Sequence, residues 1–177
     1  MSDFSKTIAS PHNEEEMKTH FLSATANWVI PQSLIAGQSP ARASSVEEEM
    51  IFLRKEANVS TFVCLQSEVP PQTSDGVDFG GTKDENEADI LPSYAEEARQ
   101  VENVTKPKFV YYGIRDEEEA ESLEVLHTLI NDLVKRIQEG EVLYVHCKGG
   151  MSPVLFYSLS TGSYANVTKI KHNNTCS

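Results

Sequence analysis

The sequence predicts an α/β domain with a mainly parallel central sheet flanked by helices. Three apolar runs of strand length, at 59–65, 108–112 and 142–147, are separated by segments with helical periodicity. Strands that alternate with helices are typical of parallel sheets, because the connection between two parallel strands normally passes through a helix. The chain has 177 residues, which is the length of a single domain.

The first part of the chain is expected to contribute a strand pair and one helix. Residues 1–25 are polar with little periodicity, which predicts a mobile segment. The apolar residues within 28–40 are interrupted by prolines, and this favours an edge strand or a hairpin. A helix is expected to begin at Ser45, which forms a capping-box pattern with Glu48, and Asn58 can end it.

The middle of the chain is expected to hold a long acidic connection and the clearest helix. Residues 67–92 are acidic and contain several prolines and glycines, which predicts an insertion or a mobile loop. A second helix is expected to start within 92–98. Apolar residues recur at three- and four-residue steps over 123–137, with acidic residues 117–119 expected in the first turn and Gly140 at the end.

The composition changes after Gly150. Residues 151–177 contain no Asp or Glu, although about 5 would be expected at the density of the preceding 150 residues. We therefore assign 26–150 to the folded domain and 151–177 to an atypical polar tail.

Charge and cysteine content exclude several classes of function. A net charge of −12 argues against nucleic acid and against anionic membrane surfaces as partners. The three cysteines are far apart and show no metal-ligand spacing, so we expect neither a metal nor a cofactor. Because no apolar run has the length of a signal peptide core or a membrane span, we expect a cytoplasmic location, with the nucleus as the alternative.

The segment that carries the chemistry is the strand at 142–147 and the turn after it. The strand ends in His146 and Cys147, and Gly149 and Gly150 follow. Parallel α/β sheets place their functional groups outside the carboxyl ends of the strands. A glycine turn at that position can direct successive backbone N–H groups to one point and so form an anion-binding nest. The positive electrostatic field of these N–H groups also favours the thiolate form of a cysteine.

This segment resembles the signature of the cysteine-dependent phosphatase superfamily, in particular the dual-specificity and tyrosine phosphatases. That signature is His-Cys, two residues, Gly, two residues, Arg, and then Ser or Thr. His146, Cys147 and Gly150 match it, whereas Pro153 stands at the arginine position. The resemblance implies that Cys147 is a nucleophile that forms a cysteinyl-phosphate and that His146 helps to order the loop. A proline cannot replace the planar fork of donors that grips two phosphate oxygens.

The resemblance also implies a general acid and a phosphate-binding loop. Asp116 precedes Cys147 by 31 residues and follows a predicted strand, which suits the acid; alternatively, Asp116 and Glu119 cap the following helix. The substrate implied is a phosphorylated protein or a small phosphomonoester. The residues expected to contribute the substrate-binding loop are Lys148, Gly149, Gly150, Met151 and Ser152.

Three hypotheses about function remain open because of Pro153. The chain is a phosphatase that hydrolyses phosphomonoesters without a metal, or a pseudophosphatase that binds phosphate without turnover. The family normally continues with a long buried helix after this loop, so the resemblance also implies that the domain is C-terminally incomplete. In the third hypothesis the chain is a variant that leaves its parental sequence after Gly150, which predicts marginal stability. Cys64 lies on the neighbouring predicted strand, and it is either an inert core cysteine or a disulfide partner for an oxidised Cys147.

Overall fold

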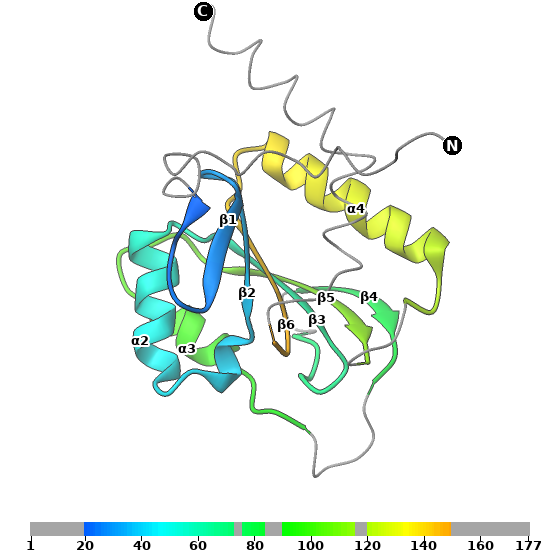
Figure 1. Ribbon diagram of the computed structural model, residues 1–177, viewed down its shortest axis with the longest axis horizontal. Helices are drawn as coiled ribbons and strands as arrows, with labels where there is room; N and C mark the ends of the chain where they lie inside the picture. The colour runs from blue at the N-terminus through cyan, green and yellow to red at the C-terminus, as the bar shows by residue number, and fades with distance from the viewer. Residues whose placement is uncertain (1–19, 73–75, 84–89, 116–119, 150–177) are drawn as a thin grey trace, which may run out of the picture.

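The computed structural model describes residues 20–72, 76–83, 90–115 and 120–149 (Figure 1). Its centre is a six-stranded sheet with the order β1-β2-β6-β3-β5-β4. β1 is antiparallel to β2, and the other pairings are parallel. The predicted α/β class with a mainly parallel sheet is therefore confirmed. The strands are β1 Ala26–Ile30, β2 Leu34–Gln38, β3 Thr61–Gln66, β4 Gly76–Gly81, β5 Lys108–Ile114 and β6 Leu143–Cys147.

Helices cover both faces of the sheet (Figure 1). α2 and α3 pack on one face, and α4 packs on the other. The side chains of β3 alternate between the two, so Phe62 and Cys64 belong to one apolar core and Val63 and Leu65 to the other. The helical segments are η1 Pro40–Arg42, α2 Val46–Ile51, the π-helical turn η2 Phe52–Glu56, α3 Ala95–Gln100 and α4 Leu123–Gln138.

The central strands match their predictions because they are buried on both faces. All six residues of β3 are buried, as are the five residues of β5 from Val110 to Ile114. Strands in this position are continuous apolar runs and do not alternate with polar residues. The hairpin predicted within 28–40 is also present, with β1 at the edge and β2 paired to β6.

Residues 67–92, predicted to be an insertion or a mobile loop, contain the strand β4, so the mobile-loop alternative is wrong for Gly76–Gly81. β4 runs parallel to β5 at the edge of the sheet, with Val77 opposite Val110. Three of its six residues are glycine, so its position depends on backbone pairing and not on an apolar pattern. Gly81 has φ +83°, and a Cβ there would lie 2.2 Å from the carbonyl oxygen of Gly113.

The helix ends show one confirmed prediction and one error. Ser45 caps α2 by accepting a hydrogen bond from the Glu48 amide at 3.3 Å, as predicted. α4 begins later than predicted: its cap is Ser122, which accepts from the Val125 amide at 3.3 Å. α4 therefore starts after the predicted first-turn residues 117–119, which lie, with Asp116, outside the described residues.

The ends of the chain are described only in part. Within the predicted mobile segment 1–25, residues 20–25 are described, and Phe21 forms an antiparallel bridge with Asn27. Residues 1–19 and the tail 151–177 lie outside the described residues. Among the helices that are described, none has both the length and the apolar character needed to cross a membrane.

A charged network holds the amino ends of three parallel strands together. Glu141, just before β6, accepts hydrogen bonds from Thr61 and from Lys108, and its Oε2 lies 3.4 Å from Arg136 Nη1. Arg136 Nε also lies 2.6 Å from Asp132 Oδ2. Burial alone would raise the pKa of Glu141, but its hydrogen bonds and the nearby cations outweigh burial and lower it.

We expect Glu141→Gln to lower the free energy of unfolding by about 1–2 kcal/mol at neutral pH. Because the pKa of Glu141 is lowered in the folded state, its contribution to the free energy of unfolding is fully present at pH values above the ordinary carboxyl pKa. That contribution is lost as the pH falls through the folded-state pKa. Urea unfolding of both proteins across the acidic range measures this difference.

Glu139→Gln is the matched control for this prediction. Glu139 pairs with Lys135 at 3.9 Å on the exposed side of α4, so its loss should change the free energy of unfolding by less than about 0.5 kcal/mol. Equal effects of the two substitutions at neutral pH would contradict the structural role of Glu141.

Candidate functional site

Cys147 lies at the carboxyl end of β6, in the middle of the sheet. β2 and β3 flank this strand, and the Cα of Cys147 is opposite that of Gln38 in β2. The thiol is free and half-buried. The predicted nucleophile therefore occupies the edge of a parallel sheet at which α/β proteins bind ligands.

His146 is held by hydrogen bonds on both ring nitrogens. It is 1% exposed, Nε2 lies 2.6 Å from the Tyr94 hydroxyl, and Nδ1 lies 3.2 Å from Gln66 Oε1. Burial lowers the pKa of His146 to about 3, so the ring is neutral at physiological pH. An amide oxygen only accepts, so Nδ1 carries the proton and Nε2 accepts from Tyr94.

This arrangement gives His146 a structural function beside Cys147. Its ring connects β6 to the end of β3 and to Tyr94, the residue just before α3. Sequence reasoning missed both partners. Gln66 could have been noticed, because it is a polar residue at the end of a buried strand. The sequence around Tyr94 contains nothing that identifies it as a partner of His146. Within the described part of the chain, Gln66 Nε2 is buried and has no hydrogen-bond partner.

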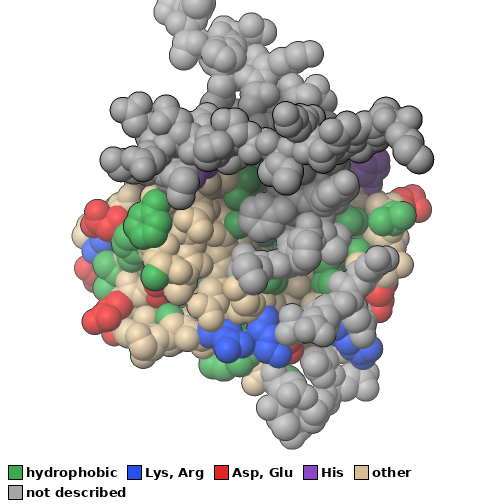
Figure 2. Space-filling model, viewed as in Figure 1, with side chains coloured by type: hydrophobic (Ala, Val, Ile, Leu, Met, Phe, Trp, Pro, Cys, Tyr) green, Lys and Arg blue, Asp and Glu red, His purple; other side chains and the backbone are tan. Residues whose placement is uncertain are grey.

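Basic residues follow four of the parallel strands at this same edge. Parallel strands that share one sheet end on the same side, so residues far apart in the sequence are brought to one region. Figure 2 shows Lys and Arg side chains along the lower edge of the molecule, where β5 and β6 end in Figure 1. The residues that follow β2, β4, β5 and β6 are Arg42, Lys83, Arg115 and Lys148.

β3 is followed by a carboxylate, Glu68, which sequence reasoning also missed. Glu68 is 5% exposed, and its Oε1 lies 3.2 Å from Lys148 Nζ. An acidic residue directly after a buried strand was the available signal, but the partner lies 80 residues away in the sequence. Of the basic residues at this edge, Lys148 therefore pairs with the buried Glu68, and Lys83 pairs with Asp78 at 3.1 Å.

The predicted loop and acid residues are only partly described. Lys148 and Gly149 continue from Cys147 as a bend, and among the described residues a Cβ at Gly149 would meet no atom within 4 Å. Close packing therefore does not require glycine at that position. The other predicted residues lie outside the described residues, namely Asp116, Gly150, Met151 and Ser152.

The segment before Asp116 is nevertheless well anchored. β5 ends at Ile114, and Arg115 is exposed at the edge that also holds Cys147. The Tyr112 hydroxyl lies 3.4 Å from both the amide nitrogen and the carbonyl oxygen of Ser122, at the start of α4. The two ends of the connection that contains Asp116 are thus fixed against each other.

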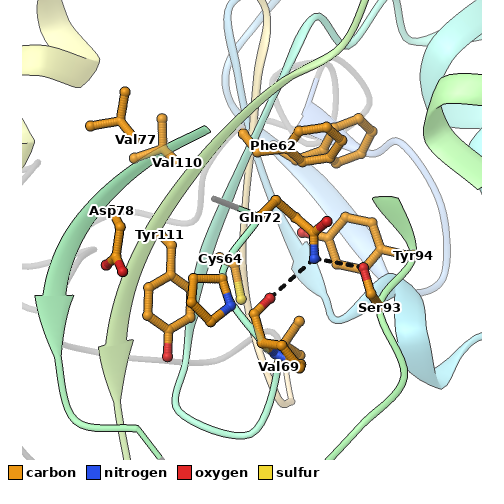
Figure 3. Close-up of a pocket in the computed structure, with 13 residues that line it drawn as sticks. Phe62, Cys64, Val69, Gln72, Val77, Asp78, Ser93, Tyr94, Val110 and Tyr111 are labelled. Carbon is orange, nitrogen blue, oxygen red and sulfur yellow. Dashed lines mark hydrogen bonds between the residues drawn. The ribbon is translucent and has the colours of Figure 1, made fainter. Parts of the chain in front are cut away.

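A small pocket lies behind the site, on the face covered by α2 and α3. Figure 3 shows Cys64 between Tyr111 and Tyr94, with Gln72 Nε2 donating to Ser93 Oγ at 2.7 Å. Cys147 does not line this pocket. Burial raises the pKa of Cys64 to about 12, which keeps the thiol protonated and favours the inert core cysteine over a disulfide partner.

Comparisons with family models, with curated protein sequences and with solved structures find no match to this chain. Within the described ranges, no group of three or more His, Cys, Asp or Glu side chains could hold a metal ion. The chemistry of the site must therefore be inferred from its own residues. A half-buried thiol at a sheet edge that also carries basic residues is an arrangement suited to binding and attacking an anion.

Proposed function

We propose that this chain is a phosphatase domain of the cysteine-dependent type, acting on phosphomonoesters with Cys147 as nucleophile. The observation that carries the proposal is the position of Cys147 at the carboxyl end of β6. The same edge of the sheet carries Arg42 and Arg115, the basic residues that follow β2 and β5, in a chain whose net charge is −12. A local concentration of cations in an acidic protein indicates an anionic ligand at that position.

The proposed reaction has two steps. The Cys147 thiolate attacks phosphorus, a sulfur–phosphorus bond forms, and the ester oxygen leaves with a proton from Asp116. Water then attacks the cysteinyl-phosphate, releasing inorganic phosphate and restoring the cysteine. Backbone amides of the loop 148–152 would hold the phosphate oxygens. The substrate is a phosphorylated protein or a small phosphomonoester, and the proposed location is the cytoplasm or the nucleus.

Phosphate binding without turnover is the second candidate function, and Pro153 favours it. Without the arginine that stabilises charge in the transition state, the chemical step loses several kcal/mol, which corresponds to orders of magnitude in rate. The cations at the carboxyl edge of the sheet would still attract a phosphate group, because the field of Arg42 and Arg115 does not depend on Pro153.

Binding of inorganic phosphate tests both candidates at once. We expect phosphate to raise the melting temperature of the wild type, as any ligand specific for the folded state does. Arg42→Glu should weaken phosphate binding about fivefold, because it reverses a charge at the carboxyl edge. Isothermal titration calorimetry at low ionic strength measures the dissociation constants.

Lys135→Glu is the matched control, since Lys135 lies on α4 near the opposite end of the strands and is exposed. It makes the same change in net charge and should leave phosphate affinity within about twofold of the wild type. An equal loss for the two variants would show that only net charge matters. A wild type that binds no phosphate would contradict the proposed function.

A further inference from the structure

An ion pair joins Lys148, the residue directly after Cys147, to Glu68 at the end of the neighbouring strand β3. The two charged atoms lie 3.2 Å apart. The Glu68 side chain is 6% exposed, whereas that of Lys148 is 40% exposed. The carboxylate is therefore the buried partner, and the lysine side chain is the more exposed one.

Glu68 is fixed in position by contacts on both sides. Its carbonyl oxygen accepts a hydrogen bond from the Leu91 amide at 2.8 Å, and the Ser67 amide donates to the Ile114 carbonyl at 3.3 Å. The Ser67 hydroxyl lies 3.5 Å from Glu68 Oε2. The backbone around Glu68 is thus attached to the end of β5 and to the segment before α3, so the carboxylate cannot easily move away from Lys148.

A buried carboxylate that loses its cation carries a large desolvation penalty. Lys148 is therefore held by Glu68 and does not act as an independent positive charge toward a bound anion. To a ligand beside Cys147 the pair has almost no net charge, and the negative partner lies within the same site. This arrangement opposes the accumulation of negative charge in the ligand.

We propose that Glu68 is a specificity-determining residue that restricts the site to ligands carrying a single phosphate group. This inference rests on the proposed function, because it assumes that a phosphate group binds beside Cys147. Neutralising Lys148 disfavours bisphosphates and polyphosphates more than monoesters, since the penalty grows with the charge of the ligand. A lysine beside the nucleophile would otherwise favour such polyanionic ligands.

Glu68→Gln tests the inference, with inorganic phosphate and pyrophosphate as probes in calorimetric titrations. The amide keeps the shape of the side chain but removes its charge, so Glu68 no longer offsets the charge of Lys148. We expect affinity to rise about threefold for phosphate and about tenfold for pyrophosphate, so the preference for phosphate declines. Glu96→Gln, an exposed substitution on α3, is the control and should leave both affinities unchanged.

The double variant Glu68→Gln, Lys148→Met separates charge balance from direct ligand contact. Removing both charges leaves no unpaired charge at the position of this ion pair, so the double variant should fold even where the single variant is unstable. We expect its affinity for both probes to match the wild type. A large loss in the double variant, or no gain in Glu68→Gln, would show that Lys148 is positioned for binding and would overturn the inference.

If the proposed function itself is wrong, the binding measurements differ from those that would overturn the inference about Glu68. In that case neither phosphate nor pyrophosphate binds to the wild type, to Glu68→Gln or to the double variant. Melting temperatures of all three proteins, recorded with and without pyrophosphate, establish that the proteins are folded during the titrations.

Discussion

Pro153→Arg is expected to raise the turnover of an aryl phosphate by about 100- to 1000-fold, because it restores the arginine of the signature. A guanidinium presents two parallel donors to phosphate oxygens and remains charged at every accessible pH. The charge on those oxygens increases in the transition state, so the gain should appear in kcat. Steady-state kinetics with para-nitrophenyl phosphate measures it.

Pro153→Lys is the matched control for the arginine variant. Lysine supplies the same charge without the planar fork, so its gain should be smaller by about tenfold. Equal gains for lysine and arginine would indicate a general effect of charge. No gain in a folded Pro153→Arg protein would contradict the assignment of position 153 to the phosphate-binding loop.

Cys147→Ser is expected to remove all measurable turnover, both in the wild type and in the Pro153→Arg background. A serine hydroxyl has nearly the same size, but it is not ionised near neutral pH, so the covalent step fails. In the more active background the loss should be at least about 10⁴-fold. Binding of inorganic phosphate should persist, because it depends on the cations and the loop.

Cys64→Ala is the control for the nucleophile, since Cys64 is the other described cysteine and is buried with a raised pKa. Its turnover should stay within about twofold of the parent protein. Turnover that survives Cys147→Ser would place the chemistry at another residue. Loss of turnover in Cys64→Ala with an unchanged melting temperature would give the second cysteine a function that its burial argues against.

The parts of the fold that sequence reasoning predicted are those with a strong local pattern. β3, β5 and β6 are buried on both faces, so each is a continuous apolar run, and α4 repeats its apolar residues at helical spacing. β4 was missed because backbone pairing with β5 determines it and half of its residues are glycine. The start of α4 was misplaced because three acidic residues resembled a first turn, whereas the cap is Ser122.

The residues of the site were also predictable where the sequence pattern is local, and not where tertiary contacts bring them together. Cys147 and His146 could be identified because they are adjacent and follow a strand. Their neighbours could not, because Tyr94 and Gln66 lie 52 and 80 residues from His146 in the sequence. The strand order alone brings Glu68 to Lys148.

The measurement that tests the central claim most directly is the capture of a phosphoryl group on Cys147. The Pro153→Arg protein would be mixed with excess para-nitrophenyl phosphate, quenched in acid within milliseconds to seconds, and digested for peptide mass mapping. We predict one added phosphoryl group on the peptide that contains Cys147, and none in the Cys147→Ser variant. Turnover without that modification, or a phosphoryl group on another residue, would contradict the assignment of Cys147 as the nucleophile.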